Sequence, residues 1–542
     1  MRRRRPRRRA GRKRPSPRRP RLRTGCPDTR AAWQRSRLVN ELRTRPGSVR
    51  FRATSPPIVT KRRNDMNAPK LSDQDTDAGV VDTGRRGFLK TAAIGAAAGA
   101  AGLGLQPSLG RAQDAAAASG AGAPPAGLEI TDLTTPISKL KSPLPLEVQR
   151  AVWDAFDSRT MNAGGDYSAI YSTRLPQFLR NGMIMPGAER SALRRNIESD
   201  LDDLTFMTKD RTPMLRLADY LHEGGPRRVQ AMMMAHKGRV VFEAYPGMNP
   251  TDLHVWYSAS KTTVTSLTTM LEAEGLFSYD DPVTKHAVEL QGSIWDDISF
   301  RDAANMSAGL DIEESFANYT VPDSWINAFW DQIIFGEGDQ WIQLMRAAKP
   351  LQGEGPGDRF RYSTANTMTL VLAVQNITQR FWLDEFNARV WSHIGAAAPF
   401  AVSMATDGTP ISGGFNQSTP EDMIRYAMLY TPSWKTVSDT QVVTDQMLES
   451  LRTLGNPSAY TGSTEEGYHL DWFGERPLTN SNQWDAVFED GAMFKHGNQG
   501  QGIYVDPGRD FCGMTFATCP NLAEIDHSPG YLRAAAKALA GG

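Results

Sequence analysis

The sequence predicts a mixed α/β fold in which an antiparallel sheet is flanked by helices. A strand–turn–strand pattern lies at residues 228–245, and a second one lies at residues 495–518. Between them, apolar residues recur at helical spacing in several segments. Strands at both ends of a domain with helices between them fit a single sheet that is covered by helices.

Residues 228–245 are typical of a hairpin. The segments 228–235 and 239–245 are rich in Val, Met and Phe, and His236-Lys237-Gly238 between them supplies a turn. The methionine run from Met232 to Met234 can form a soft binding surface, but we favour core packing. We therefore expect this pair in the centre of the sheet.

The next predicted helix carries a chemical signature, because Ser258 and Lys261 form an S-x-x-K motif at its N-terminal end. Apolar residues then recur at helical spacing until Gly275 provides a stop; they are Val264, Leu267, Met270 and Leu271. Unpaired N–H groups and the positive end of the helix dipole favour an anion beside Ser258, such as the oxygen of an attacked carbonyl. The spacing places the Lys261 amine on the same face. Taken alone, the pair also fits an ordinary serine cap with a solvated lysine, so other segments must decide.

Four later segments complete the predicted domain. Aromatic residues are frequent at 325–341, where we expect core for most of them. Tyr362 stands just before the start of another apolar helix. Lys495-His496-Gly497-Asn498 enters the second hairpin, and residues 531–539 form a closing helix.

Taken together, these pieces resemble the serine β-lactamase-like superfamily, which includes class C β-lactamases, D-Ala-D-Ala carboxypeptidases, family VIII-type esterases and 6-aminohexanoate-dimer hydrolases. The resemblance runs from about residue 228 to residue 540. Its motifs are Ser258-x-x-Lys261, Gly275-Leu276 to Pro282-Val283, Met306 to Leu310, Pro356-Gly357-x-x-Phe360-x-Tyr362-Ser363, Gly413-Gly414 before Thr419-Pro420, and Gly497-x-x-Gly500-Gln501 before Val505-Asp506-Pro507. It implies a β-lactamase/transpeptidase-like fold with a mostly helical second subdomain.

The resemblance also implies roles for individual residues. Ser258 would be acylated by an amide or ester carbonyl, and Lys261 could hold its proton if burial and a second cation, Lys495, lower its pKa. Tyr362 would relay the proton or receive it, and which of Lys261 and Tyr362 is the base stays open. The N–H groups of Ser258 and Asn498 would form the oxyanion hole, next to Gly497. No cofactor is implied, and no metal-ligand spacing occurs among the eight histidines.

Two departures from the family pattern bear on the substrate. Thr364 stands where β-lactamases carry an amide that helps to hold the substrate, and His496 replaces the Thr of a Lys-Thr-Gly box. The missing amide counts against efficient penicillin hydrolysis, and the change to His496 alters the group that faces a substrate carboxylate. The Gly497-x-x-Gly500-Gln501 and Tyr504-Val505-Asp506-Pro507 motifs look closer to those of 6-aminohexanoate-dimer hydrolases and esterases. We expect a serine hydrolase that cleaves a small amide or ester, or a small peptide. The alternatives are a D-Ala-D-Ala carboxypeptidase or class C-type β-lactamase and, third, a non-catalytic peptidoglycan-binding module.

The N-terminal residues differ sharply in composition. Residues 1–65 hold 24 Lys or Arg and three acidic residues, a net charge of +21, so residues 66–542 carry −19 of the overall +2. Such a block is typical of a nucleic-acid-binding tail or of a disordered extension upstream of a start at Met66. We favour the extension because aromatic residues are not interleaved, and we expect no nucleic-acid partner for the acidic remainder.

An export signal is predicted next. Arg85 and Arg86 precede Phe-Leu-Lys and an Ala/Gly-rich run, which resembles a bacterial twin-arginine signal. The run is too short to span a membrane, and Gly110-Arg111-Ala112 offers a cleavage site. We therefore expect a periplasmic or secreted protein without a stable membrane anchor.

The predicted plan is thus an extension at 1–65, a signal region at 66–112, a flexible linker at 113–135, an N-terminal segment of helices and loops at 136–225, and the catalytic domain at 226–542. Short helices are expected at 145–156, 191–204 and 213–221 within the N-terminal segment. Cys512 and Cys519 are expected about 23 Å apart on one strand, at about 3.3 Å per residue, and should not form a disulfide. The sequence leaves the oligomeric state open.

Overall fold

The computed structural model describes residues 134–522 and 524–541. The Arg-rich extension, the signal region with Arg85 and Arg86, and nearly all of the linker lie outside these residues, so those expectations remain predictions. Within the described part of the chain, no helix combines the length and apolar character needed to cross a bilayer.

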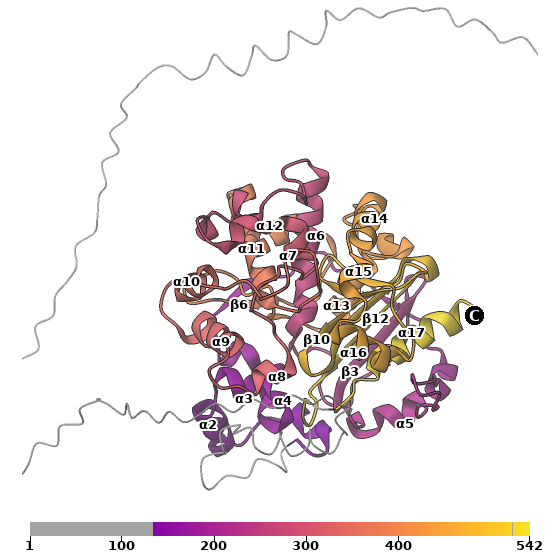
Figure 1. Ribbon diagram of the computed structural model, residues 1–542. Helices are drawn as coiled ribbons and strands as arrows, with labels where there is room; N and C mark the ends of the chain where they lie inside the picture. The colour runs from indigo at the N-terminus through magenta and orange to yellow at the C-terminus, as the bar shows by residue number, and fades with distance from the viewer. Residues whose placement is uncertain (1–133, 523, 542) are drawn as a thin grey trace, which may run out of the picture. The chain divides into compact units, whose positions relative to one another are not determined.

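The main element is an eight-stranded sheet, which confirms the predicted fold class (Figure 1). Its strands lie in the order β2 (Arg194–Arg195), β4 (Arg239–Ala244), β3 (Val229–His236), β12 (Phe511–Ala517), β11 (Gln501–Asp506), β10 (Met493–Gly497), β9 (Trp484–Val487) and β8 (Thr479–Ser481). All neighbours are antiparallel except β2 and β4. Both predicted hairpins are present, and β3 pairs with β12, which joins the two ends of the domain.

The two faces of this sheet belong to different cores, because successive strand residues point to opposite sides. Ala231 and Met233 of β3 pack in the larger core, with Met423 and Ile424 of α13 (Pro420–Met428). The alternating residues of β3 pack in a second core with α17 (Ser528–Leu539). All three methionines of the run are fully buried, so core packing is confirmed.

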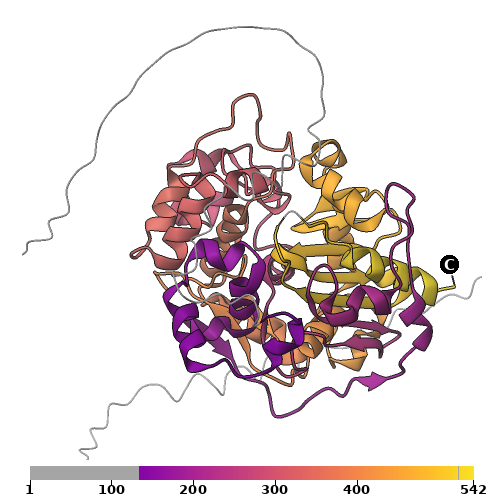
Figure 2. The same cartoon turned by 90° about the horizontal axis from the view of Figure 1, so that it is seen from below.

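A helical half lies beside the sheet, at the left of Figure 1 and in red tones in Figure 2. The helices from the nucleophile helix onward are α6 (Lys261–Ala273), α7 (Phe300–Ala304), α8 (Phe316–Tyr319), α9 (Trp325–Phe335), α10 (Gln340–Arg346), α11 (Thr364–Thr378), α12 (Trp382–Arg389), α13, α14 (Asp445–Thr453), α15 (Pro457–Tyr460), α16 (Thr464–Phe473) and α17. In Figure 1, α6 runs between this half and the sheet. Residues 261–269 of α6 are all buried, and its threonine hydroxyls donate to carbonyls three or four residues earlier, which satisfies polar groups inside the core.

A smaller sheet positions the start of α6. Its order is β1 (Asn181–Ile184), β6 (Phe400–Ser403), β7 (Asn416–Ser418) and β5 (His254–Val255). Directly after β5, the N–H of Trp256 donates to the carbonyl of Asn416 at 2.8 Å. The chain therefore enters the Ser258 turn from a fixed strand end.

The N-terminal segment contributes to both sheets as well as supplying helices. It contains α2 (Leu146–Asp154), α3 (Ser158–Asn162), α4 (Gly165–Arg174) and α5 (Leu217–Leu221), and strands β1 and β2. The helix predicted at 191–204 is wrong: the chain forms β2 and a 3₁₀ turn at Ser199–Asp203. The N–H groups of Asn196 and Glu198 donate to the carbonyls of Val240 and Val241, at 2.8 and 2.9 Å, so pairing with β4 outweighs local helix preference.

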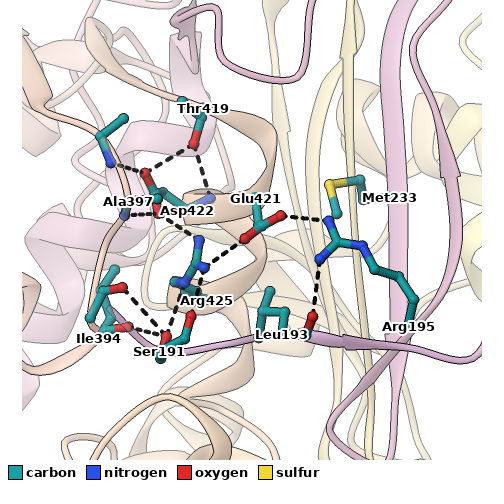
Figure 3. A network of polar contacts seen from close by, with 12 residues as sticks. Ser191, Leu193, Arg195, Met233, Ile394, Ala397, Thr419, Glu421, Asp422 and Arg425 are labelled. Carbon is teal, nitrogen blue, oxygen red and sulfur yellow. Dashed lines mark hydrogen bonds and ion pairs between the residues drawn. The ribbon is translucent and has the colours of Figure 1, made fainter. Parts of the chain in front are cut away.

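Figure 3 shows a buried polar network that ties this segment to α13. Arg425 is 3% exposed; its Nε donates to Ser191 Oγ at 2.9 Å and its Nη1 donates to Asp422 at 2.9 Å. Asp422 also accepts the N–H groups of Ala397 and Ala398 at 2.8 and 3.0 Å. At the outer edge, Arg195 bridges Glu421 and Glu243. Arg425 and Asp422 together therefore connect Ser191, α13 and residues 397–398.

We expect Arg425→Met to lower the free energy of unfolding by about 3 kcal/mol, because it leaves Asp422 buried without its cation. Arg195→Met is the matched control: its side chain is 39% exposed, so the loss should stay below about 1 kcal/mol. Urea unfolding followed by tryptophan fluorescence measures both. Equal losses of unfolding free energy for the two variants would contradict the idea that burial makes the Arg425 ion pair matter more than the Arg195 ion pairs.

Candidate active site

Ser258 lies at the point where the small sheet, α6 and β10 meet. It sits in the 3₁₀ turn Tyr257–Ser260, and α6 starts at Lys261, so the predicted helix start is present with a tighter first turn. The first N–H groups of a helix have no partner within it. Ser258 is partly exposed, whereas the preceding Tyr257 is buried. The backbone of Tyr257 adopts the left-handed conformation, with a φ of 42°. A serine oxygen is thus presented from a strained, fixed turn.

Lys261 is fully buried and reaches three acceptors. Its Nζ lies 2.9 Å from Ser258 Oγ, 3.0 Å from Thr364 Oγ1 and 2.6 Å from the carbonyl oxygen of Gly413. Three acceptors match the three donors of an ammonium group. In the neutral amine, one contact must reverse, and the Ser258 hydroxyl can be the donor to the free lone pair. The geometry therefore allows proton transfer between Ser258 and Lys261.

Burial lowers the pKa of Lys261 to about 7. Glu314 opposes this shift, Lys495 adds to it, and Asp485 opposes it more weakly. Burial and Lys495 are the two causes that the sequence suggested. A lysine with this pKa supplies a substantial fraction of free amine near neutral pH, which an ordinary lysine does not.

The Tyr362 ring lies close to both lysines. The Nζ atoms of Lys261 and Lys495 are 5.1 and 4.5 Å from its ring centroid. Its buried hydroxyl makes no hydrogen bond to the described residues, and burial, together with Asp485 and Glu314, raises its pKa well above 10. The Ser258 hydroxyl opposes that rise, although the two hydroxyls do not meet hydrogen-bond geometry. The phenol therefore keeps its proton at neutral pH and is available as a donor.

Asp485 is a site residue that the sequence reasoning missed. It lies on β9, beside β10, and its carboxylate pairs with the ammonium of the fully buried Lys495. It also accepts the N–H of His496 at 2.8 Å. Burial lowers the pKa of Lys495, and Asp485 opposes this. A charged residue inside the apolar strand Trp484–Val487 was the available signal.

Glu314 was also missed, and it explains the departure at Thr364. Glu314 Oε2 accepts the Thr364 N–H at 2.9 Å and the Thr364 hydroxyl at 2.6 Å. The Thr364 hydroxyl therefore stands between Lys261 and Glu314, in place of the family amide. Trp330, 4% exposed, donates from Nε1 to the other Glu314 oxygen at 3.3 Å.

In the aromatic-rich stretch, Phe329, Trp330 and Trp341 are core as predicted, whereas Phe335 is 49% exposed.

Gly497 and Asn498 lie against the Ser258 turn. A Cβ atom on Gly497 would stand 2.3 Å from the Trp256 carbonyl oxygen and 3.1 Å from the Ser258 nitrogen, so only glycine fits there. This approach brings the end of β10 alongside the first turn of the nucleophile helix. The sequence-predicted residues Ser258, Lys261, Tyr362, Lys495, Gly497 and Asn498 thus gather at one place.

His496 stands between Lys495 and Gly497, at the second position of this box. Its Nε2 lies 3.1 Å from Asp526 Oδ2, and its ring is 4.2 Å from that of Trp472. Its side chain is 16% exposed, so part of the imidazole reaches the surface while Asp526 holds it. Among the described residues, no group of three His, Cys, Asp or Glu side chains could hold a metal ion. Cys512 and Cys519 are both buried free thiols.

Comparisons with known proteins identify the family of the chain. The Beta-lactamase family model matches residues 217–538. The 6-aminohexanoate-dimer hydrolase of Paenarthrobacter ureafaciens is 24% identical over 350 residues, which cover 64% of this chain and 85% of that protein. A solved Bacillus anthracis structure, assigned as a candidate 6-aminohexanoate-dimer hydrolase, superposes with a TM-score of 0.56 at 17% identity and covers 71% of this chain and 98% of that one. That likeness concerns the fold.

We expect the reactivity of Ser258 toward a fluorophosphonate probe to rise with pH through a midpoint near 7, because the free amine of Lys261 is the form that accepts the proton. Glu314→Gln should move the midpoint to lower pH, since the Glu314 charge raises the Lys261 pKa. Labelling rates measured from pH 5 to about 9 test both statements.

Glu313→Gln is the matched control, because Glu313 pairs with Arg361 at 3.3 Å instead of acting on Lys261. Its midpoint should equal that of the unmodified protein. A profile that rises only near the pKa of a tyrosine would contradict the role of Lys261.

Proposed function

Because the chain belongs to the beta-lactamase family and is a serine hydrolase, we propose that it cleaves a small amide or ester through an acyl-enzyme on Ser258. The observation that carries the proposal is the contact of 2.9 Å between Ser258 Oγ and the buried Nζ of Lys261. A serine hydroxyl is a weak nucleophile unless a base stands within hydrogen-bond reach. Lys261 is such a base, with a pKa of about 7.

In the proposed cycle, Lys261 takes the proton of Ser258 as its Oγ attacks the substrate carbonyl. The N–H groups of Ser258 and Asn498 receive the oxyanion. Tyr362, whose hydroxyl is protonated and whose ring lies near both lysines, passes a proton to the leaving nitrogen or oxygen and is reprotonated from Lys261. Water then attacks the acyl-enzyme by the reverse route. The assignment of Lys261 as base rests on the contrast between its lowered pKa and the raised pKa of Tyr362.

The substrate class that we propose is a linear amide of the 6-aminohexanoate-dimer type, or an ester of similar size. The support is the relative from Paenarthrobacter ureafaciens, whose name gives that substrate. Thr364 adds to it, because its hydroxyl is committed to Lys261 and Glu314, which leaves no amide side chain at this position to hold a β-lactam.

We expect purified protein to hydrolyse p-nitrophenyl esters and the linear 6-aminohexanoate dimer, and to turn over nitrocefin slowly. Ser258→Ala should lose at least about a thousandfold in activity, as removal of a covalent nucleophile does. Hydrolysis rates on the three substrates are the measurement. Fast nitrocefin turnover or release of D-Ala from a D-Ala-D-Ala peptide would favour the alternative functions. If Ser258→Ala were as active as the unmodified protein, Ser258 could not be the nucleophile.

We also propose that the protein is exported by the twin-arginine route, on the support of Arg85 and Arg86 ahead of an Ala/Gly-rich run. Replacing both arginines by lysine should retain the precursor in the cytoplasm, whereas the equally conservative change Lys70→Arg, which lies between Met66 and the arginine pair, should not. Immunoblots of cytoplasmic and periplasmic fractions measure the distribution. Unchanged export of the Arg85, Arg86 variant would contradict the proposal.

A further inference from the structure

The N-terminal segment reaches the active site through one backbone carbonyl. The carbonyl oxygen of Met161, at the end of α3, accepts the Tyr257 hydroxyl at 2.9 Å and the Gln499 side-chain amide at 2.9 Å. The Gln499 amide also lies 3.2 Å from the Tyr257 hydroxyl. The next carbonyl, that of Asn162, accepts the side-chain amide of Asn498 at 3.2 Å. These contacts join residues that are more than 90 positions apart in the chain.

The two side chains on Met161 flank the proposed oxyanion donors. Tyr257 precedes Ser258, and Gln499 follows Asn498. Both have positive φ, 42° for Tyr257 and 71° for Gln499. Residues other than glycine seldom adopt this conformation, and it persists only where surrounding contacts hold it. The Ser258 N–H belongs to the peptide group that Tyr257 forms with Ser258, and Gln499 is the residue directly after the Asn498 donor. Each donor therefore lies next to a backbone position that needs external support.

The Met161 carbonyl is itself held firmly. Asp157 and Thr160 form a capping box at the start of α3, and the Ser168 hydroxyl also donates to the Met161 carbonyl, at 2.9 Å. The turn after α3 is anchored to the end of the sheet, because the N–H of Gly165 donates to the Cys519 carbonyl at 2.8 Å. Gly164 has no room for a Cβ atom, which would stand 2.8 Å from the same carbonyl oxygen. The support is thus fixed independently of Ser258.

We propose that Met161 positions the two oxyanion-hole N–H groups by holding Tyr257 and Gln499, which makes the N-terminal segment a working part of the active site. This inference rests on the proposed acyl-enzyme function. Met161, Tyr257 and Gln499 are at most 3% exposed, so they are positioning residues that act through the backbone and do not touch the substrate. Met161 lies outside residues 217–538, which the family model matches.

Loss of this support should weaken binding of the transition state and leave substrate binding nearly unchanged. The oxyanion hole acts on the charge that develops during attack, so a misdirected donor lowers kcat more than it raises KM. We expect Tyr257→Phe and Gln499→Leu each to lower kcat for a p-nitrophenyl ester by about tenfold to a hundredfold, with KM within about threefold. The affinity for a boronic acid, which forms a tetrahedral adduct on serine, should fall by a similar factor.

The double variant should lose less than the product of the two single losses, because both side chains bond to one carbonyl and to each other. Tyr531→Phe is the matched control. Tyr531 is fully buried in the second core, and its hydroxyl donates to the carbonyl of Leu215 in the N-terminal segment at 2.7 Å. It should lower the unfolding temperature about as much as Tyr257→Phe and leave kcat and boronate affinity unchanged.

The experiment uses the full chain and measures kcat, KM, boronate affinity and thermal unfolding for all four variants. Unchanged kcat and boronate affinity in Tyr257→Phe and Gln499→Leu would overturn the inference, as would equal kcat losses in Tyr531→Phe. If Gln499→Leu does not fold, the near-isosteric Tyr257→Phe still decides. Failure of the proposed function is a separate result, seen as absent fluorophosphonate labelling of Ser258 in the unmodified protein.

Discussion

The burial of the Lys261 amine is the constraint on which the rest of the site depends. A buried ammonium is costly unless hydrogen bonds and opposite charges compensate it. The helical half supplies Thr364 with Glu314 behind it, and the sheet supplies Asp485, which neutralises the second lysine. Two lysines and two acidic residues thus surround Tyr362. At Lys261, the acidic residues offset the cost of burial only in part, and this leaves the pKa of Lys261 low enough for proton transfer.

This arrangement explains why the fold places the site where it does. Residues 261–269 of α6 are buried on every side of the helix. The turn that holds Ser258 comes just before them, where the helical half and the sheet meet. Ser258 is only partly covered there, while Lys261 three residues later is not exposed at all. A helix in the core thus gives a partly exposed nucleophile and a fully buried base.

Much of this could be predicted from the sequence, because the signals are local. The S-x-x-K motif, the hairpins and the Lys495-His496-Gly497 box each depend on residues within a few positions of one another. The acidic partners are harder to predict. A charge inside an apolar strand marks Asp485 without indicating its partner, and Glu314 acquires its role only when α11 is brought beside it. The expected helix at 191–204 failed for the same kind of reason: its backbone pairs with β4, a partner about 45 residues away. The support given by Met161 leaves no trace in sequence, because every residue carries a carbonyl.

The family match begins at residue 217, but residues before it also shape the active site. Strand β1 completes the small sheet that leads into the Ser258 turn, and Ser191 anchors the segment on α13 through Arg425. A chain that began at residue 217 would contain every motif residue of the site. It would nevertheless lack an edge of the small sheet and the carbonyl that holds Tyr257 and Gln499. Since those two residues hold strained backbone beside the oxyanion donors, the motif residues alone do not define the geometry that the chemistry requires.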